Sequence, residues 1–187
     1  MSLLAPAPLQ GRRRILVLGC GGAGKSTFAR QLGDRLALPV VHLDIEYWSF
    51  GWKPTPEAEW QERVRRLVAA DDWVMDGNFS GSLSTRLSRC DAIVFLDLPR
   101  WVCIVSVLLR WFRYRFASRP DLPEGCPEKI DLEFLRWVWD FRQRSRQKVL
   151  DALEHAGPGV EVLQVTRRAQ TRALLEALPR RELAYAE

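Results

Sequence analysis

A glycine-rich run near the start of the chain has the composition and spacing of a phosphate-binding loop. Residues 19–26 read Gly-Cys-Gly-Gly-Ala-Gly-Lys-Ser and match G-x-x-x-x-G-K-[ST] at every fixed position. Glycines let backbone N–H groups wrap a phosphate chain where a Cβ would collide or φ must be positive. The pattern predicts that Lys25 reaches the β- and γ-phosphates of ATP and that the Ser26 hydroxyl holds Mg²⁺. The residues expected to hold the phosphates are Gly19, Gly21, Gly22, Ala23, Gly24, Lys25, Ser26 and Thr27.

Three aspartates follow apolar runs that have the pattern of buried strands. They are Asp44, Asp76 and Asp97. In open parallel sheets, ligands bind beyond the carboxyl ends of the strands, so these carboxylates are candidates for the same site. We expect Asp97 to be structural, because Asp97-Leu98-Pro99-Arg100 reads as a strand-to-helix entry with a capping side chain.

An aromatic cluster follows Asp44 closely. Tyr47, Trp48, Trp52 and Trp60 could stack on a ring-bearing ligand, or they could form the core of a helical subdomain, which is the more common role of such a cluster. We assign Trp137, Trp139 and Phe141 to packing of the core or of a lid. His42 is expected to be a satisfied core residue.

Basic residues concentrate in one later segment. The net charge is +5, and residues 110–148 hold ten basic and six acidic side chains. Such a segment attracts phosphate, although a solvated basic face is the commoner explanation of a charge run. The basic residues at positions 142–148 spread around a helix, and no helix-turn-helix or zinc-finger pattern is visible, so the sequence disfavours nucleic-acid binding.

The elements that must position these residues alternate along the chain. Strands are expected over residues 15–18, 40–43, 73–75, 92–96 and 160–165, and helices over 26–36, 55–70, 100–116 and 131–153. Apolar strands alternating with amphipathic helices indicate an α/β fold with a parallel sheet of about five strands. An apolar strand before residue 19 and a helix from about residue 25 also argue against a chance glycine-rich turn.

Composition excludes several other classes of protein. The 187 residues are 47% hydrophobic and 27% charged, which is typical of one ordinary folded domain. No apolar run approaches the ~18 residues of a membrane span, and the basic cluster at residues 12–14 follows the apolar start instead of preceding it, unlike a signal peptide. Four cysteines without a C-x-x-C pair fit a reducing cytoplasm, and nothing has structural-zinc spacing.

With these motifs in place, the chain resembles the adenylate-kinase-like branch of P-loop proteins, and within it the small bacterial proteins named DNA topology modulation proteins. The resemblance covers about residues 14–165 and is carried by 19–27, 42–44, 47–48, 73–81, 96–101, 119–121, 125–128 and 134–137. It implies a P-loop NTPase fold with helices on both faces of the sheet and a helical, arginine-rich lid. It also implies that residues 45–72 form an acceptor-binding subdomain and residues 110–148 the lid, within one domain over 14–187. The opening stretch, with Pro6 and Pro8, predicts a loose tail over 1–13.

The chain departs from the adenylate kinase pattern where that family clamps the acceptor phosphate. There, an arginine follows the D-G pair within three residues, whereas here Asp76-Gly77 is followed by no arginine before Arg86. Residues 44–61 contain no arginine either. A phosphate acceptor needs guanidinium contacts, while a hydroxyl acceptor needs a base or an orienting carboxylate, so a hydroxyl is favoured over AMP.

The sequence therefore predicts an ATP- and Mg²⁺-dependent kinase for a small-molecule acceptor. By the resemblance, Lys25, Asp44, Arg110, Arg113 and Arg119 are catalytic. Ser26 and Asp76 position Mg²⁺, and the acceptor is bound by Asp44, Trp48, Asp76, Asn78 and Arg86. The alternatives are a nucleoside monophosphate kinase and an ATP-binding regulator associated with DNA topology. No membrane association is expected, and the sequence indicates no oligomeric state.

Overall fold

The computed structural model describes residues 8–114, 122, 125–126 and 131–179. The strands are β1 (Arg14–Gly19), β2 (Val40–His42), β3 (Trp48–Ser49), β4 (Lys53–Pro54), β5 (Trp73–Asp76), β6 (Ala92–Leu96) and β7 (Glu161–Val165). The helices are α1 (Lys25–Leu36), α2 (Leu43–Tyr47), α3 (Glu57–Ala69), the 3₁₀ helix η1 (Ser80–Ser82), α4 (Leu83–Leu87), α5 (Arg100–Tyr114), α6 (Leu132–Arg144), α7 (Arg146–Glu154) and α8 (Arg168–Glu176).

Five parallel strands form the main sheet in the order β2-β5-β1-β6-β7. β1, β5 and β6 occupy its centre and are buried almost throughout. They are apolar on both faces because helices cover both faces. β7 lies at an edge, where its side chains alternate between partly buried and exposed. The predicted α/β class and five-stranded parallel sheet are confirmed.

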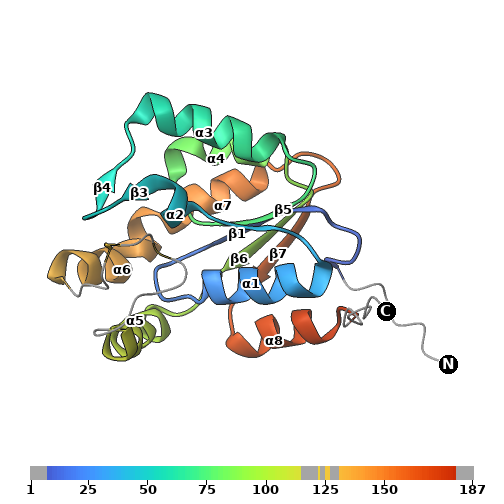
Figure 1. Ribbon diagram of the computed structural model, residues 1–187. Helices are drawn as coiled ribbons and strands as arrows, with labels where there is room; N and C mark the ends of the chain where they lie inside the picture. Colours follow the sequence, from blue (N-terminus) through green and yellow to red (C-terminus); the bar gives the residue numbers. More distant parts are fainter. Residues whose placement is uncertain (1–7, 115–121, 123–124, 127–130, 180–187) are drawn as a thin grey trace, which may run out of the picture.

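Helices pack on both faces of the sheet. α1 and α8 run along one face, and α3, α4 and α7 lie on the other (Figure 1). α5 and α6 contact each other at the end of the sheet where β1 leads into α1 (Figure 1). This end, which collects the carboxyl ends of the strands, is where ligands bind in open α/β sheets.

Several element boundaries differ from the sequence-based expectation. The strand expected over 40–43 ends at His42, and Leu43 already begins α2, so Asp44 lies in the first turn of a short helix. The helix expected over 131–153 is two helices, because the chain leaves the helical path at Ser145. The helix expected over 55–70 begins only after Pro56, and the small antiparallel pair β3–β4 was not predicted.

All four cysteines are free thiols buried in the protein. Cys20 of the phosphate loop lies next to Cys103 of α5, and its Sγ contacts the carbonyl oxygen of Val138 at 3.6 Å. A hydrogen bond with Cys103, followed by burial, raises the pKa of the Cys20 thiol. Cys20 is therefore neutral and adds no negative charge to the loop. Across the part of the chain that is described, no helix is both long and apolar enough to cross a membrane.

Candidate active site

The glycine-rich run forms a loop between the end of β1 and the start of α1, wedged against two neighbouring elements. A Cβ on Gly19 would lie 2.7 Å from the carbonyl oxygen of Leu96 in β6, and Gly19 has a φ of 148°. A Cβ on Gly22 would lie 2.3 Å from the carbonyl oxygen of Cys103, at a φ of 80°. Only glycine fits at these two positions, so the sequence dictates how closely the loop approaches β6 and α5.

The loop ends at the N-terminus of α1, where the helix presents backbone N–H groups. Gly24, in the left-handed region, precedes the helix and has no side chain to cap it. Unpaired N–H groups and the helix dipole make such an end an anion site. Lys25 donates a hydrogen bond from Nζ to the carbonyl oxygen of Cys20 at 3.1 Å, so its ammonium group is held over the loop.

A cleft of about 1170 Å³ opens directly in front of this loop. The predicted site residues that line it are Gly21, Gly22, Gly24, Lys25, Ser26, Thr27, Asp44, Trp48, Asn78, Arg110 and Arg113. Gly19 and Ala23 belong to the loop but do not line the cleft. Arg119 lies outside the described residues.

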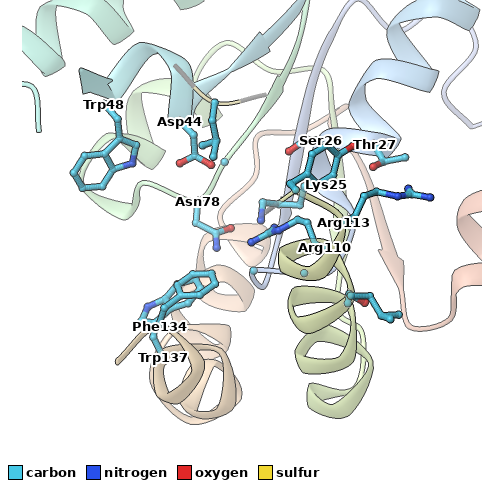
Figure 2. Close-up of a pocket in the computed structure, with 18 of the residues that line it drawn as sticks. Lys25, Ser26, Thr27, Asp44, Trp48, Asn78, Arg110, Arg113, Phe134 and Trp137 are labelled. Atoms are coloured by element: carbon cyan, nitrogen blue, oxygen red, sulfur yellow. The ribbon is translucent and has the colours of Figure 1, made fainter. Parts of the chain in front are cut away.

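The cleft is divided by chemistry. Lys25, Arg110 and Arg113 lie together with the hydroxyl side chains of Ser26 and Thr27 at one end (Figure 2). Asp44 and Trp48 lie at the other end, on the segment that follows β2 (Figure 2). One end thus attracts polyphosphate, and the other offers a carboxylate and an aromatic ring.

Asp76 does not line this cleft, contrary to its predicted acceptor-binding role. At the end of β5, its Oδ1 lies 2.5 Å from Nδ1 of His42 on the neighbouring strand β2. The pair is nearly buried, so His42 is the satisfied core residue that was expected. Asp76 still lies near the phosphate loop, because it pairs in register with Val17 of β1, the strand that leads into that loop.

Arg86 is the clearest correction to the predicted site. Its side chain is completely buried and donates hydrogen bonds to the backbone carbonyls of Gly77, Asn78, Phe79 and Ser82. Burial lowers the pKa of this guanidinium to about 10, which leaves it charged at neutral pH. Because its donors are used on the chain itself, the prediction that Arg86 contacts the acceptor is wrong. It holds the loop that follows β5 in shape.

Asn78 lines the cleft and also ties that loop to the phosphate loop. Its Oδ1 accepts a hydrogen bond from the Gly19 N–H at 3.0 Å, and its Nδ2 donates to the Gly19 carbonyl oxygen at 2.8 Å. One side chain thus satisfies both backbone groups of Gly19. Arg86 therefore holds the loop after β5 in its conformation, and Asn78 fixes this loop to the phosphate loop.

Asp97 is structural, as expected, but it does not cap a helix. It is buried at the end of β6, where its carboxylate accepts hydrogen bonds from Arg146 at 2.7–2.9 Å and from Gln164 at 2.8 Å. Burial by itself would raise the pKa of Asp97, yet the Arg146 and Gln164 hydrogen bonds outweigh it and lower that pKa. This interaction connects β6, α7 and β7.

Several residues that line the cleft were not predicted as site residues, among them Phe134, Trp137 and Arg168. Phe134 and Trp137, which come from α6, face the phosphate loop, while Arg168 begins α8 and reaches Ser106 of α5. Periodicity places Phe134 and Trp137 on a helix but cannot say that the helix covers the loop. The position of Arg168, three residues after the last strand, was a usable signal, because strand ends collect at this edge.

The aromatic cluster after Asp44 divides into two parts. Tyr47 and Trp60 pack edge-to-face at 5.1 Å, and both contact Phe79, so they are core residues. Trp48 and Trp52 line the cleft, with ring centroids 5.6 Å apart. The core role is confirmed for Tyr47 and Trp60, while stacking on a ligand stays a prediction for Trp48 and Trp52.

The sheet order and the phosphate loop together define the P-loop NTPase fold in its kinase-like form. Solved structures with this fold include shikimate kinase from Acinetobacter baumannii in complex with shikimate, at 15% identity and a TM-score of 0.57 over 92% of this chain and 93% of that one. They also include shikimate kinase from Bacteroides thetaiotaomicron, at 17% identity and a TM-score of 0.52 over 89% of this chain and 95% of that one.

Comparison by sequence places the chain in a family. It is 30% identical over 132 residues to the uncharacterized protein YqaC of Bacillus subtilis, covering 68% of this chain and 71% of YqaC, and it belongs to the same family. It is also 26% identical over 156 residues to the adenylate kinase of Gloeobacter violaceus, covering 64% of this chain and 71% of that enzyme. No family model matches the chain.

Proposed function

We propose that the protein is a kinase that transfers the γ-phosphoryl group of Mg-ATP to a hydroxyl group of a small molecule. The observation that carries this proposal is the layout of one cleft, with the phosphate loop at one end and the Asp44 carboxylate at the other. A cleft of about 1170 Å³ has room for a nucleotide and a second small ligand.

The phosphate end has the groups that a triphosphate needs. Backbone amides of residues 21–27 would surround the β- and γ-phosphates, and Lys25 would exchange its bond to the Cys20 carbonyl for a phosphate oxygen. Arg110 and Arg113, which reach the cleft from α5, would neutralise charge on the group being transferred. Arg119 is proposed for the same role from the resemblance.

The chain also has side chains that fit Mg²⁺. The Ser26 hydroxyl lines the cleft next to Lys25. Asp76, at the end of β5 next to β1, is proposed as the second group from the resemblance, and it would have to turn from His42 to reach a coordinated water. Mg²⁺ bound there would neutralise phosphate charge. No group of three or more His, Cys, Asp or Glu side chains able to hold a metal occurs among the described residues, which fits an ion held mainly by substrate phosphates.

Asp44 would act on the acceptor. Its carboxylate would orient the hydroxyl and take its proton while the acceptor oxygen bonds to the γ-phosphorus. The bond from that phosphorus to the β–γ bridging oxygen breaks, its electron pair leaves with ADP, and the proton passes from Asp44 to solvent. Asp44 would also repel a phosphate acceptor, and Arg86 is committed to backbone carbonyls and cannot compensate.

The second candidate is a nucleoside monophosphate kinase, which the similarity to an adenylate kinase favours. The third, suggested by the resemblance to DNA topology modulation proteins, is an ATP-binding regulator that acts on DNA. We further propose that residues 45–72 form an acceptor-binding subdomain and residues 110–148 a lid, since both segments contribute side chains to the cleft.

Coupled detection of ADP release separates these candidates. Purified protein with Mg-ATP is offered nucleosides, sugars, shikimate-like acids and nucleoside monophosphates, and we expect a hydroxyl compound to stimulate ADP release. AMP phosphorylation at ~10 s⁻¹ would establish the second candidate instead. Salt-sensitive affinity for DNA without any stimulated ADP release would establish the third.

A further inference from the structure

Two aromatic walls from separate parts of the chain line the cleft, one near Asp44 and the other against Gly21 of the phosphate loop. Trp48 and Trp52, which follow α2, form one wall. Phe134 and Trp137 of α6 form the other, with nearly parallel rings 5.8 Å apart at an interplanar angle of 14°. In Figure 2 the Trp48 ring and the Phe134–Trp137 pair face the cleft from its two sides, with Asn78 between them. We call this arrangement the aromatic slot.

The second wall is fixed in place by the phosphate loop. A Cβ on Gly21 would lie 3.0 Å from the Phe134 ring and 3.2 Å from the Trp137 ring, so both rings rest on that glycine. Trp137 nevertheless remains 40% exposed. A large ring held in position with this much surface open to the cleft is suited to stacking on a ligand.

Among the described residues, the polar side chains that line the cleft beside these walls include the carboxylates of Asp44 and Asp131 and the amide of Asn78. Asp44 supplies a carboxylate, while Asn78 already uses both ends of its amide on Gly19. Lys25 and Arg113 lie toward the phosphate loop, and the Arg110 side chain points toward Asn78 (Figure 2). A carboxylic acid would meet the Asp44 carboxylate, whereas a flat apolar ring would find aromatic faces to stack on.

We infer that the acceptor is a planar aromatic compound that bears a hydroxyl group, with its ring in the aromatic slot and its hydroxyl at Asp44. This inference rests on the proposed kinase function. Two sources share this chemistry, a nucleoside and a hydroxymethyl-substituted heteroaromatic ring. Loss of one stacking wall should weaken ring binding about 5- to 100-fold.

The test measures binding without ATP, by calorimetry or equilibrium dialysis, so that it does not depend on catalysis. The probes are a ribonucleoside, hydroxymethylpyridine, ribose and shikimate. We expect one or both aromatic probes to bind and the two non-aromatic probes to bind at least tenfold more weakly. Binding by the nucleoside alone would identify the sugar as part of the recognised group, and binding by both would identify the ring.

Variants locate the binding. Trp48→Ala and Trp137→Leu should each weaken binding of the aromatic probe about 5- to 100-fold, and Trp137→Phe should retain most of the affinity. Trp101→Ala is the matched control, because Trp101 is 63% exposed on α5 and does not line the cleft. Phe134→Leu replaces Trp137→Leu if the latter fails to fold.

Three outcomes would overturn the inference. They are equal binding of ribose or shikimate, equal effects of Trp48→Ala and Trp101→Ala, and displacement of the aromatic probe by a non-hydrolysable ATP analogue, which would mean that the slot holds the base of ATP. The experiments distinguish a wrong inference about the aromatic slot from a wrong kinase proposal. Phosphorylation of a non-aromatic alcohol would reject the slot alone, and tryptophan-dependent ring binding without phosphoryl transfer would reject the kinase alone.

Discussion

Asp44 occupies the first turn of α2, two residues after β2 ends, and faces the cleft across from Lys25. Its position on a helical turn directs a carboxylate into the space where an acceptor must lie. The sequence placed Asp44 at this edge because strand ends share one side of a parallel sheet. The short helix was not predicted, since five residues carry too little periodicity.

Asp44→Asn should leave Mg-ATP affinity nearly unchanged and lower turnover roughly 10²- to 10⁴-fold, because an amide cannot take the acceptor proton. Calorimetry gives the affinity and the coupled assay gives the turnover. Asp131→Asn is the control, since Asp131 also lines the cleft but serves as the N-cap of α6. Equal turnover of Asp44→Asn and the parent protein would contradict the proposed role.

Arg86 has a purely structural consequence that can be measured. Arg86→Leu should lower the free energy of unfolding by about 3 kcal/mol or more, because it leaves the carbonyls of residues 77–79 without their donor. Urea denaturation measures this change. Arg65→Leu on α3 should cost less than about 1 kcal/mol, because Arg65 forms an exposed ion pair. Comparable losses in the two variants would reject the role given to Arg86.

At the scale of elements, the Asp97–Arg146 ion pair joins the end of β6 to the start of α7. The sequence suggested a single long helix over this region, and the break at Ser145 could not be foreseen from periodicity. Arg146 turns toward a carboxylate 49 residues earlier in the chain. Such a partner is visible only once the sheet has formed. For the same reason, the sequence could not predict that His42 would form a hydrogen bond with Asp76.

This ion pair predicts a definite dependence of stability on pH. The pKa of Asp97 is lowered in the folded protein, below about 3.9 in an unfolded chain, so its stabilising effect is present above about pH 4 and is lost as pH falls through the folded-state pKa. Arg146→Met removes the main group that lowers this pKa and leaves the Asp97 carboxylate buried without its charged partner. The difference in unfolding free energy between parent and variant should therefore be large at pH 7, about 3 kcal/mol, and shrink by pH 3.

Urea denaturation at several pH values checks this expectation. Arg144→Met serves as the control, because Arg144 is mostly exposed and pairs with Asp140 on the same helix. A difference between parent and Arg146→Met that stays constant from pH 7 to pH 3 would contradict the ion-pair explanation.

At the scale of the whole molecule, the phosphate loop connects the central strand, α1, α5 and α6. β1 leads into it, Gly22 presses on α5, and Gly21 carries two rings of α6. The motif in the sequence was enough to locate this loop and the parallel sheet behind it. It did not show that α6 covers the loop, because Gly21 and the rings of α6 are more than 100 residues apart in the sequence.

Binding at a loop with so many neighbours should stabilise the entire fold. Mg-ATP at a hundredfold excess over Kd should add ~2.7 kcal/mol to the free energy of unfolding, because only the folded state binds. Lys25→Ala should remove most of this increase while leaving the melting temperature of the ligand-free protein nearly unchanged, and thermal denaturation with and without Mg-ATP measures both. Lys148→Ala, on α7, is the control. An unchanged melting temperature of the parent protein in Mg-ATP would contradict the assignment of residues 19–26 as an ATP-binding loop.

The burial of every cysteine makes the native surface inert toward thiol reagents. None of the four thiols is more than 7% exposed, so a maleimide dye should leave the folded parent chain unmodified. Leu132 begins α6 and is 84% exposed, and Leu132→Cys would therefore supply a single reactive thiol. A fluorophore attached there would report on α6 at the mouth of the cleft. Its emission should change when Mg-ATP binds if this helix belongs to a closing lid, and should stay constant if it does not.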